Sequence, residues 1–549
     1  MSEIKAALPD HPALDSIENE KKANDDLHLE SLGDVEGNRT LAELTAIDRA
    51  VAAELAEQSM TFREAIRDYR SAVFWSFAIS LCIIMEGYDT ALPGTFVGLP
   101  AFRQKYGEYV NEEVGYQLTP AWQSGLSQIS SVGAILSIFA TSWFQQKYGY
   151  RKVIQTGLVA MFGFVFIVFF AQNIVTLAIG YHLCGWAWGT FQASVVSYAS
   201  EITPVALRGY LTTYVNLCWI IGQFLAAGVL KAMASRDDEW AYRIPFAIQW
   251  VWPIPLITLI YFAPESPWFL VRAGRLEEAA ASVRRIQKKG SKVDPRDTVA
   301  MMVRTNEHEK AVSEGVRYID CFKGSDLRRT EIACLAWSSQ LLAGLGFSGQ
   351  YVYFLQQAGI SPEDAFSFNL GSTAMAFVGA ILSWFIMGRF GRRTIMVWGT
   401  SGLTTLLLVL GILTIPAKTL SGAKWAQAVL MLVWVLAFDL SIGPLAYAIV
   451  GEVSSTRLRG LTVGLARNAY NIVGIATGIL LSYQLNPTAW NWGGYTGFFW
   501  AGSAFLIAVW TYFRLPECKG RTFRELDILF ERGVPARKFS STTIDAYEE

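Results

Sequence analysis

The sequence predicts an all-α membrane protein with twelve transmembrane helices arranged as two six-helix halves. Three observations predict this class: an apolar composition, recurring long apolar stretches and an internal repeat. Of the 549 residues, 52% are hydrophobic and only 17% are charged, whereas soluble domains contain about 25% charged residues. The 46 basic and 47 acidic residues nearly balance, which argues against nucleic acid as a partner because nucleic-acid binding requires a basic surface.

Apolar stretches long enough to cross a hydrocarbon core of about 30 Å recur from residue 72 onward. Continuous blocks of this length are typical of spanning helices, whereas the strands of a membrane barrel would be short and alternating. The twelve expected spans are 72–99, 122–144, 153–171, 174–198, 211–234, 244–262, 330–356, 366–388, 394–415, 425–450, 461–483 and 494–514.

Three polar segments flank the two halves, which we expect at 72–262 and 330–514. Residues 1–71 contain no apolar run and are expected to form a disordered tail. Residues 263–329 form a basic linker with short helices, one of them at 276–289, and 515–549 form a short second tail. If the N-terminus is inside, the short cytosolic loops contain nine basic residues and the longer opposite loops contain six. The positive-inside rule therefore places both termini in the cytosol.

The same motifs occur in both halves and in the same order. The segment that begins at Glu201 (EITPVALRG) recurs at Glu452 (EVSSTRLRG), GYRK at 149 recurs as GRRT at 391, and PESP at 264 recurs as PECK at 516. The spacings of 251, 242 and 252 residues indicate a duplicated six-helix unit.

Each repeated motif lies at a cytosolic helix end. Arginine and glutamate there can pair across helix ends and stabilise a closed state that must also open, although the basic residues could instead serve only as topology anchors. The predicted cytosolic gate consists of Arg151, Glu201, Arg208, Arg392, Glu452 and Arg459.

Two similar bundles with a site between them near the membrane midplane are typical of alternating-access carriers. The sequence contains no Walker loop and no HExxH motif, and its six cysteines are scattered singly. We therefore expect no enzyme activity, no metal and no cofactor.

These motifs resemble those of the major facilitator superfamily, specifically its sugar porter family. A narrower likeness to fungal maltose/α-glucoside:proton symporters lies in RGYLTTYVN at 208–216, YRIPFAIQWVW at 242–252, GLARNAYN at 464–471 and NPTAWNW at 486–492. The resemblance implies the major facilitator fold and proton-driven import of a maltose-like α-glucoside across the plasma membrane. The expected partners are a sugar, a proton and the lipid bilayer, and the expected state is a monomer.

Two positions depart from the pattern of that family. Tyr181 and Ala134 stand where many proton-coupled members carry an arginine and a glutamate. A facilitative sugar uniporter and an exporter of a small secondary metabolite therefore remain the alternatives.

Ionisable groups within spanning helices are costly, so each one is a functional hypothesis. Glu86 and Asp89 are three residues apart in the first span and share a helix face. We expect them to bind and release the coupled proton, and the resemblance points to the same two positions. Arg467 in the eleventh span is expected to join them in coupling and to need a carboxylate partner, either Asp439 or Glu452. A purely structural ion pair is the other interpretation.

Neutral amides can pair with sugar hydroxyls, and aromatic rings can stack on the faces of a sugar. Polar side chains deep in apolar spans are therefore candidates for sugar binding, although each amide could instead join two helices by a hydrogen bond. By resemblance, Asn216, Gln223 and Gln340 contact the sugar from both halves. The full predicted set is Asn216, Gln223, Gln340, Gln350, Tyr447, Tyr470 and Asn471.

Overall fold

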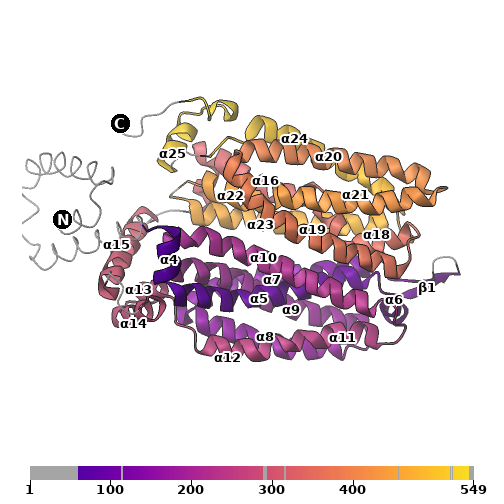
Figure 1. The fold of residues 1–549 in the computed structure, drawn as a ribbon, viewed down its shortest axis with the longest axis horizontal. Helices are drawn as coiled ribbons and strands as arrows, with labels where there is room; N and C mark the ends of the chain where they lie inside the picture. The colour runs from indigo at the N-terminus through magenta and orange to yellow at the C-terminus, as the bar shows by residue number, and fades with distance from the viewer. Residues whose placement is uncertain are drawn as a thin grey trace, which may run out of the picture.

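The computed structural model describes residues 60–112, 115–288, 294–313, 317–455, 457–519, 521 and 523–542. Helices make up nearly all of this described part of the chain, and one small antiparallel hairpin, β1 (Glu108–Asn111) with β2 (Gly115–Gln117), projects at one end of the bundle (Figure 1). Most of the predicted N-terminal tail falls outside the described residues.

Six rods form the N-terminal half. They are α5 (Arg70–Phe96), α7 (Pro120–Tyr148), α8 (Tyr150–Phe169), α9 (Ile174–Ile202), α10 (Val205–Met233), and α11 (Trp240–Ile248) continued through η2 (Gln249–Val251) into α12 (Pro253–Tyr261).

Six rods also form the C-terminal half. They are α16 (Gly324–Leu342) continued by α17 (Leu345–Gly349) and α18 (Tyr351–Gln357), α19 (Pro362–Arg389), α20 (Arg392–Ala417), α21 (Ser421–Leu440) continued by α22 (Ile442–Val453), α23 (Arg459–Leu485), and α24 (Thr496–Arg514) preceded by η4 (Gly493–Tyr495).

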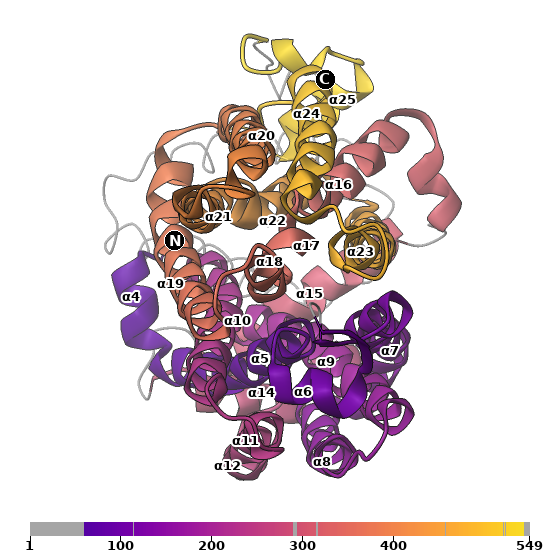
Figure 2. The ribbon, with the colours of Figure 1, turned by 90° about the vertical axis from the view of Figure 1, so that its right-hand side faces the viewer.

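Within the described residues, nine helical segments are long and apolar enough to cross a membrane. Three further rods, α9, α16–α18 and α23, do not meet that criterion but lie among the others in the same bundle (Figure 2). Together they give the twelve spans that the sequence predicted. The three less apolar rods carry most of the polar side chains of the candidate site described below.

Three of the twelve rods are interrupted. Pro253 begins α12 after a turn of 3-10 helix, and Gly344 separates α16 from α17 with a left-handed φ of 101°. Ser441 separates α21 from α22 with φ −126° and ψ −89°. Next to this last break, the Gln340 amide donates to the carbonyl of Gly443 at 2.7 Å, so the side chain of α16 pairs with backbone that is close to the irregular segment.

Glycine permits the closest helix contacts inside the N-terminal half. A Cβ atom placed on Gly87 would lie 2.1 Å from the carbonyl oxygen of Trp219, and one on Gly222 would lie 2.1 Å from that of Ile84. Helices α5 and α10 therefore approach each other backbone to backbone, as spanning helices do where small residues meet. Between the halves, α10 packs along α19 and α23 packs along α7 (Figure 2).

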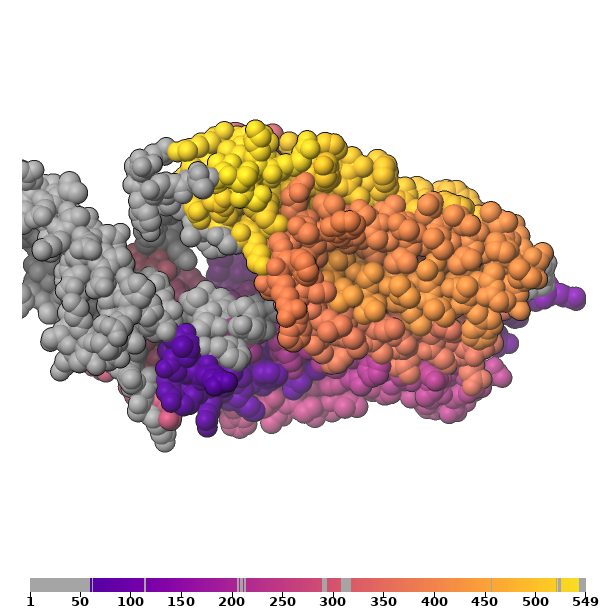
Figure 3. Space-filling model, turned by 45° about the horizontal axis from the view of Figure 1, so that its top comes forward, coloured from indigo at the N-terminus to yellow at the C-terminus, as the bar shows by residue number. Residues whose placement is uncertain are grey.

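Short helices gather at the end of the bundle opposite the β hairpin (Figure 1). They are α4 (Phe62–Asp68), α13 (Pro267–Arg272), α14 (Leu276–Ile286), α15 (Pro295–Ser313), η3 (Tyr318–Phe322), α25 (Phe523–Glu531) and η5 (Ala536–Lys538). Helix α14 ends three residues before the end of the predicted 276–289 helix. The linker also contacts the first span, because Gln287 donates to the hydroxyl of Tyr69 at 3.1 Å. In the space-filling view, the orange and yellow C-terminal half lies along the length of the purple and magenta N-terminal half (Figure 3).

We expect Gly222→Ala to destabilise the protein by about 1–3 kcal/mol, because its methyl group would force α5 and α10 apart. The matched control is Gly163→Ala in α8, where no atom lies within 4 Å of the added methyl group. Fluorescence-detected size exclusion of heated samples measures both. Equal melting temperatures for the two variants would contradict this account of the helix contact.

Candidate coupling and substrate site

A chain of hydrogen bonds crosses from one half to the other through the middle of the membrane region. The Gln192 side chain on α9 donates from Nε2 to Oε1 of Glu86 on α5 at 2.7 Å. Its Oε1 atom accepts from the Arg467 guanidinium on α23 at 3.3 Å. Gln192 therefore connects a carboxylate of the N-terminal half with the cation of the C-terminal half.

Asp89 lies one helical turn beyond Glu86 on α5 and is fully buried. Its Oδ2 atom accepts from the indole nitrogen of Trp188 at 3.3 Å. The other oxygen, Oδ1, has no hydrogen-bond partner among the described residues, and neither has Oε2 of Glu86. A buried carboxylate with an unused oxygen is costly as an anion, and that oxygen is a site where a proton can bind.

The expected carboxylate partner of Arg467 was wrong. Glu452 pairs with Arg392 instead, and Asp439 packs against Gly379 of α19. The Arg467 guanidinium lies 5.0 Å from the ring centre of Tyr470 and 5.8 Å from that of Trp337. Aromatic faces and the Gln192 amide therefore take the place of a direct ion pair.

The sugar-binding candidates divide into two groups. The first group consists of amides that are partly exposed. They are Asn216 and Gln223 on α10 and Asn471 on α23. In the C-terminal half, Tyr447 is 46% exposed and meets Trp337 edge-on at 5.4 Å. Tyr470 faces the Arg467 guanidinium, and Trp337 lies against both Tyr447 and Arg467.

The second group is already engaged within the protein. Gln340 is buried and donates to the carbonyl of Gly443. Gln350 accepts from Gln123 at 3.0 Å and donates to Ser482 at 3.3 Å. Gln350 therefore lies in a contact between the halves near the hairpin end.

That contact, which we call the outer seam, is a network of buried amides near the hairpin end. Asn486 of the C-terminal half donates to Oε1 of Gln123 and to the carbonyl of Leu118, both at 2.9 Å. Arg103 donates to Gln356 at 3.1 Å, and Tyr353 donates to Gln117 at 3.1 Å. Polar side chains thus join the two halves at this end of the bundle.

At the opposite end, the predicted gate residue Glu452 pairs within its own half, whereas Glu201 pairs with the linker. Arg392 donates to both oxygens of Glu452 through Nε, at 3.0 and 3.1 Å, and its Nη2 atom reaches Oε1 at 2.7 Å. Glu201 accepts from Arg272 at 2.6 Å and from the hydroxyls of Tyr150 and Ser266. Arg272 is thus a partner that the sequence analysis did not include.

The other three predicted gate residues are Arg151, Arg459 and Arg208. Arg151 donates from its side chain to the carbonyl of Ala263 at 3.4 Å. Arg459 is the first residue of α23. Arg208 belongs to α10, and its side chain lies outside the part of the structure that is described.

The repeated PE motifs cap helices in both halves. Glu265 accepts from the backbone amides of Tyr150 at 3.0 Å and Arg151 at 3.3 Å, at the first turn of α8. Glu517 accepts from the amides of Arg392 at 2.8 Å and Arg393 at 3.1 Å, at the first turn of α20. A carboxylate there satisfies free amides and the positive end of the helix dipole.

Glycine makes both caps possible. A Cβ atom on Gly149 would lie 2.5 Å from Oε2 of Glu265, and one on Gly391 would lie 2.0 Å from Oε2 of Glu517. Burial raises the pKa of Glu265 above its ordinary value, while the amides of Ser266, Arg151 and Tyr150 oppose that rise.

The sequence analysis missed Gln192 and Trp188 as members of the site. Both lie on α9 four residues apart, so they share the helix face that meets Glu86 and Asp89. Gln192 is an amide in an otherwise apolar span, and the same criterion that selected Gln223 could have found it.

Twelve spanning rods in two repeated halves, with buried charges connected across the halves, define a multi-pass membrane carrier. A family model described as "Sugar (and other) transporter" matches residues 75–530. The chain belongs to this sugar transporter family.

Curated relatives align over nearly the whole chain. The maltose permease MAL31 of Saccharomyces cerevisiae is 38% identical over 97% of this chain and 89% of its own length. The general alpha-glucoside permease of the same yeast is 38% identical over 94% of this chain and 84% of its own.

Solved structures show the same fold. A partially occluded inward-open conformation of the Escherichia coli xylose transporter XylE matches with a TM-score of 0.68 and 19% identity, over 82% of this chain and 100% of that one. A proton:xylose symporter XylE structure bound to 6-bromo-6-deoxy-D-glucose matches with a TM-score of 0.66 and 19% identity, over 84% of this chain and 100% of that chain.

We expect Gly391→Ala to displace Glu517 from the first turn of α20 and to lower stability by about 1 kcal/mol, the usual value of a helix cap. Gly388→Ala, three residues earlier, is the matched control because no atom lies within 4 Å of its added methyl group. Thermal unfolding of the purified variants measures the difference. An unshifted melting temperature for Gly391→Ala would exclude the cap as a stabilising contact.

We expect Gln192→Leu to reduce transport roughly ten- to a hundredfold, because it removes hydrogen bonds to two charged groups worth about 1.5–3 kcal/mol. Gln172→Leu, an exposed amide before α9, is the control. Uptake of labelled sugar, normalised to surface expression, measures the effect. Wild-type uptake by Gln192→Leu would show that the connection between the halves is dispensable.

Proposed function

We propose that this protein is a plasma-membrane symporter that imports a maltose-like α-glucoside together with a proton, with both termini in the cytosol. The observation that carries the proposal is the connection from Glu86 through Gln192 to Arg467, which joins the two halves. The names of the yeast relatives, maltose permease and general alpha-glucoside permease, support α-glucosides as the substrate class.

In this proposal, the proton binds at Asp89 and Glu86. Each carboxylate has one oxygen that accepts a hydrogen bond and one oxygen without a partner among the described residues. A proton on the unused oxygen removes the cost of a buried anion. Release of that proton restores the charge of Glu86 and strengthens its link through Gln192 to Arg467.

Arg467 supplies the cation that the fourth span lacks. Tyr181 stands at the position where the resemblance predicts an arginine, and it is buried and neutral. The charge therefore comes from the C-terminal half through Gln192. Arg467 and Glu86 belong to different halves. Protonation of Glu86 therefore alters the attraction between the N-terminal and C-terminal halves.

In this proposal, the sugar is bound by polar and aromatic groups from both halves. Asn216 and Gln223 offer amides from the N-terminal half, and Asn471 offers one from the C-terminal half. The exposed ring of Tyr447 can stack on a sugar face. The buried indole N–H of Trp337, which has no partner among the described residues, is a further donor for a sugar hydroxyl.

The conformation described here corresponds to a carrier closed on the outside. The outer seam joins the halves near the hairpin, whereas at the other end the ion pair Arg392–Glu452 lies within the C-terminal half and Arg272–Glu201 joins the linker to the N-terminal half. Sugar enters after the outer seam opens and the two halves close at the cytosolic end. Rocking of the halves about the central site then delivers sugar and proton inward.

We expect Asp89→Asn to abolish the alkalinisation of the medium that accompanies sugar uptake and to reduce accumulation at least tenfold. The amide cannot exchange a proton, so the sugar gradient loses its driving force. Asp237→Asn, an exposed carboxylate beyond α10, is the matched control. External pH is recorded in deenergised yeast and the accumulation of labelled maltose in energised yeast, both lacking their own permeases.

The same assay separates the alternatives. Uptake without a pH change in the unmodified protein would contradict symport and identify a uniporter. Absence of uptake of maltose, trehalose, sucrose and glucose, with confirmed surface expression, would contradict sugar import and favour the exporter.

A further inference from the structure

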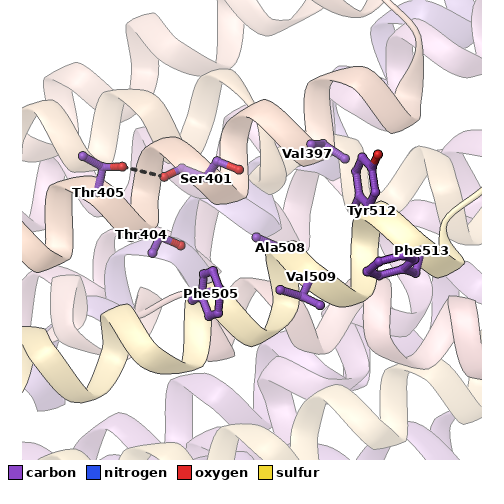
Figure 4. Close-up of a pocket in the computed structure, with 9 residues that line it drawn as sticks. All are labelled: Val397, Ser401, Thr404, Thr405, Phe505, Ala508, Val509, Tyr512 and Phe513. Atoms are coloured by element: carbon purple, nitrogen blue, oxygen red, sulfur yellow. Dashed lines mark hydrogen bonds between the residues drawn. The ribbon is translucent and has the colours of Figure 1, made fainter.

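Two cavities meet at Phe513, at the cytosolic end of α24. The first is a groove of about 390 Å³ between α20 and α24 (Figure 4). It is lined by Val397, Ser401, Thr404, Thr405, Phe505, Ala508, Val509, Tyr512 and Phe513. The second has a volume of about 560 Å³ and lies between the starts of α16 and η5 and the ends of α24 and α25, with Phe513 in its wall as well.

The groove has an apolar surface that faces the membrane. The hydroxyls of Thr404 and Thr405 donate to carbonyls of their own helix, those of Thr400 and Ser401, at 2.8 and 3.0 Å. Phe505 and Phe513 are more than half exposed. Both helices belong to segments apolar enough to span a membrane, so the groove is in contact with lipid chains.

The second cavity is rich in arginine. Its lining includes Arg328, Arg514 and Arg537, against one acidic residue, Glu531. Arg514 is fixed by Glu331 and Arg328 donates to the carbonyl of Val534 at 2.8 Å, while Nε of Arg328 is buried without a partner in the described structure.

Arginine also surrounds the point where the cavities meet. The guanidinium of Arg537 lies 5.3 Å from the ring centre of Tyr512 and 5.2 Å from that of Phe513. The guanidinium of Arg393 also lies 5.3 Å from the ring centre of Tyr512. The arginines at the membrane surface therefore lie directly beside the apolar groove.

We propose that this site binds one anionic phospholipid of the cytosolic leaflet, with its phosphate on the arginines and an acyl chain in the groove. Guanidinium groups bind phosphate by charge-assisted hydrogen bonds, and the cytosolic leaflet is the anionic one. The inference rests on the topology in the proposed function, which places this end of α24 in the cytosol. A bound lipid would connect α20 and α24 with the C-terminal segment that carries η5.

The test is native mass spectrometry of the purified full-length protein without sugar, titrated with phosphatidylserine or phosphatidylcholine. We expect tighter binding of phosphatidylserine, and roughly fivefold weaker binding of it by Arg537→Gln. Ala508→Trp fills the groove and is expected to weaken binding independently of charge. Lys538→Gln, the adjacent exposed cation outside the lining, is the control and should bind as the unmodified protein does.

Glycerophosphoserine, a soluble headgroup without acyl chains, distinguishes a lipid from a free phosphate ester. We expect it not to displace the lipid at millimolar concentration. Full displacement together with unchanged binding by Ala508→Trp would overturn the proposal in favour of a soluble anion. Equal retention of the two lipids, or unchanged binding by Arg537→Gln, would also overturn it. Lipid retention is measured without transport, so its failure is distinguishable from failure of the symport proposal.

Discussion

The arrangement of this protein depends on how one guanidinium is accommodated in the interior of a membrane. A cationic side chain without partners in hydrocarbon is costly. Two aromatic rings and the Gln192 amide contact Arg467. Gln192 also donates a hydrogen bond to Glu86 in the other half. Gln192 on α9 and Tyr470 on α23 are the groups on these two helices that meet this requirement.

The duplication appears in the contacts at the helix ends as well as in the sequence. Glu265 and Glu517 occupy equivalent positions at the first turns of α8 and α20, each next to a glycine that leaves room for the carboxylate. The partners of Glu201 and Glu452 differ, however, because Arg272 comes from the linker helix α13 and Arg392 from α20 itself. The N-terminal half is therefore tied to the linker in a way that its counterpart is not.

The sequence allowed a good prediction of the spans because membrane thickness and apolar length are directly related. It located each of the twelve rods, and the repeated motifs predicted their division into two halves. It did not reveal the break at Gly344, because glycine is common inside ordinary spanning helices.

The candidate site was harder to predict, since its contacts join distant parts of the chain. Proximity in sequence suggested Asp439 for Arg467, whereas the actual neighbour, Gln192, is 275 residues away in the other half. Gln350 was selected as a polar residue in an apolar span, but its amide contacts Gln123 across the outer seam. Amides that bind a ligand and amides that join helices have the same appearance in a sequence. The roles of the selected residues in transport remain predictions.

The outer seam has a consequence for the energetics of opening. Its hydrogen bonds include those made by the amides of Gln123, Gln350, Asn486 and Gln356. When such groups separate, water can replace each lost partner, so the net free energy of every exchange is small. To the extent that the barrier consists of such replaceable hydrogen bonds, a small molecule with modest affinity can bias the equilibrium between the two conformations.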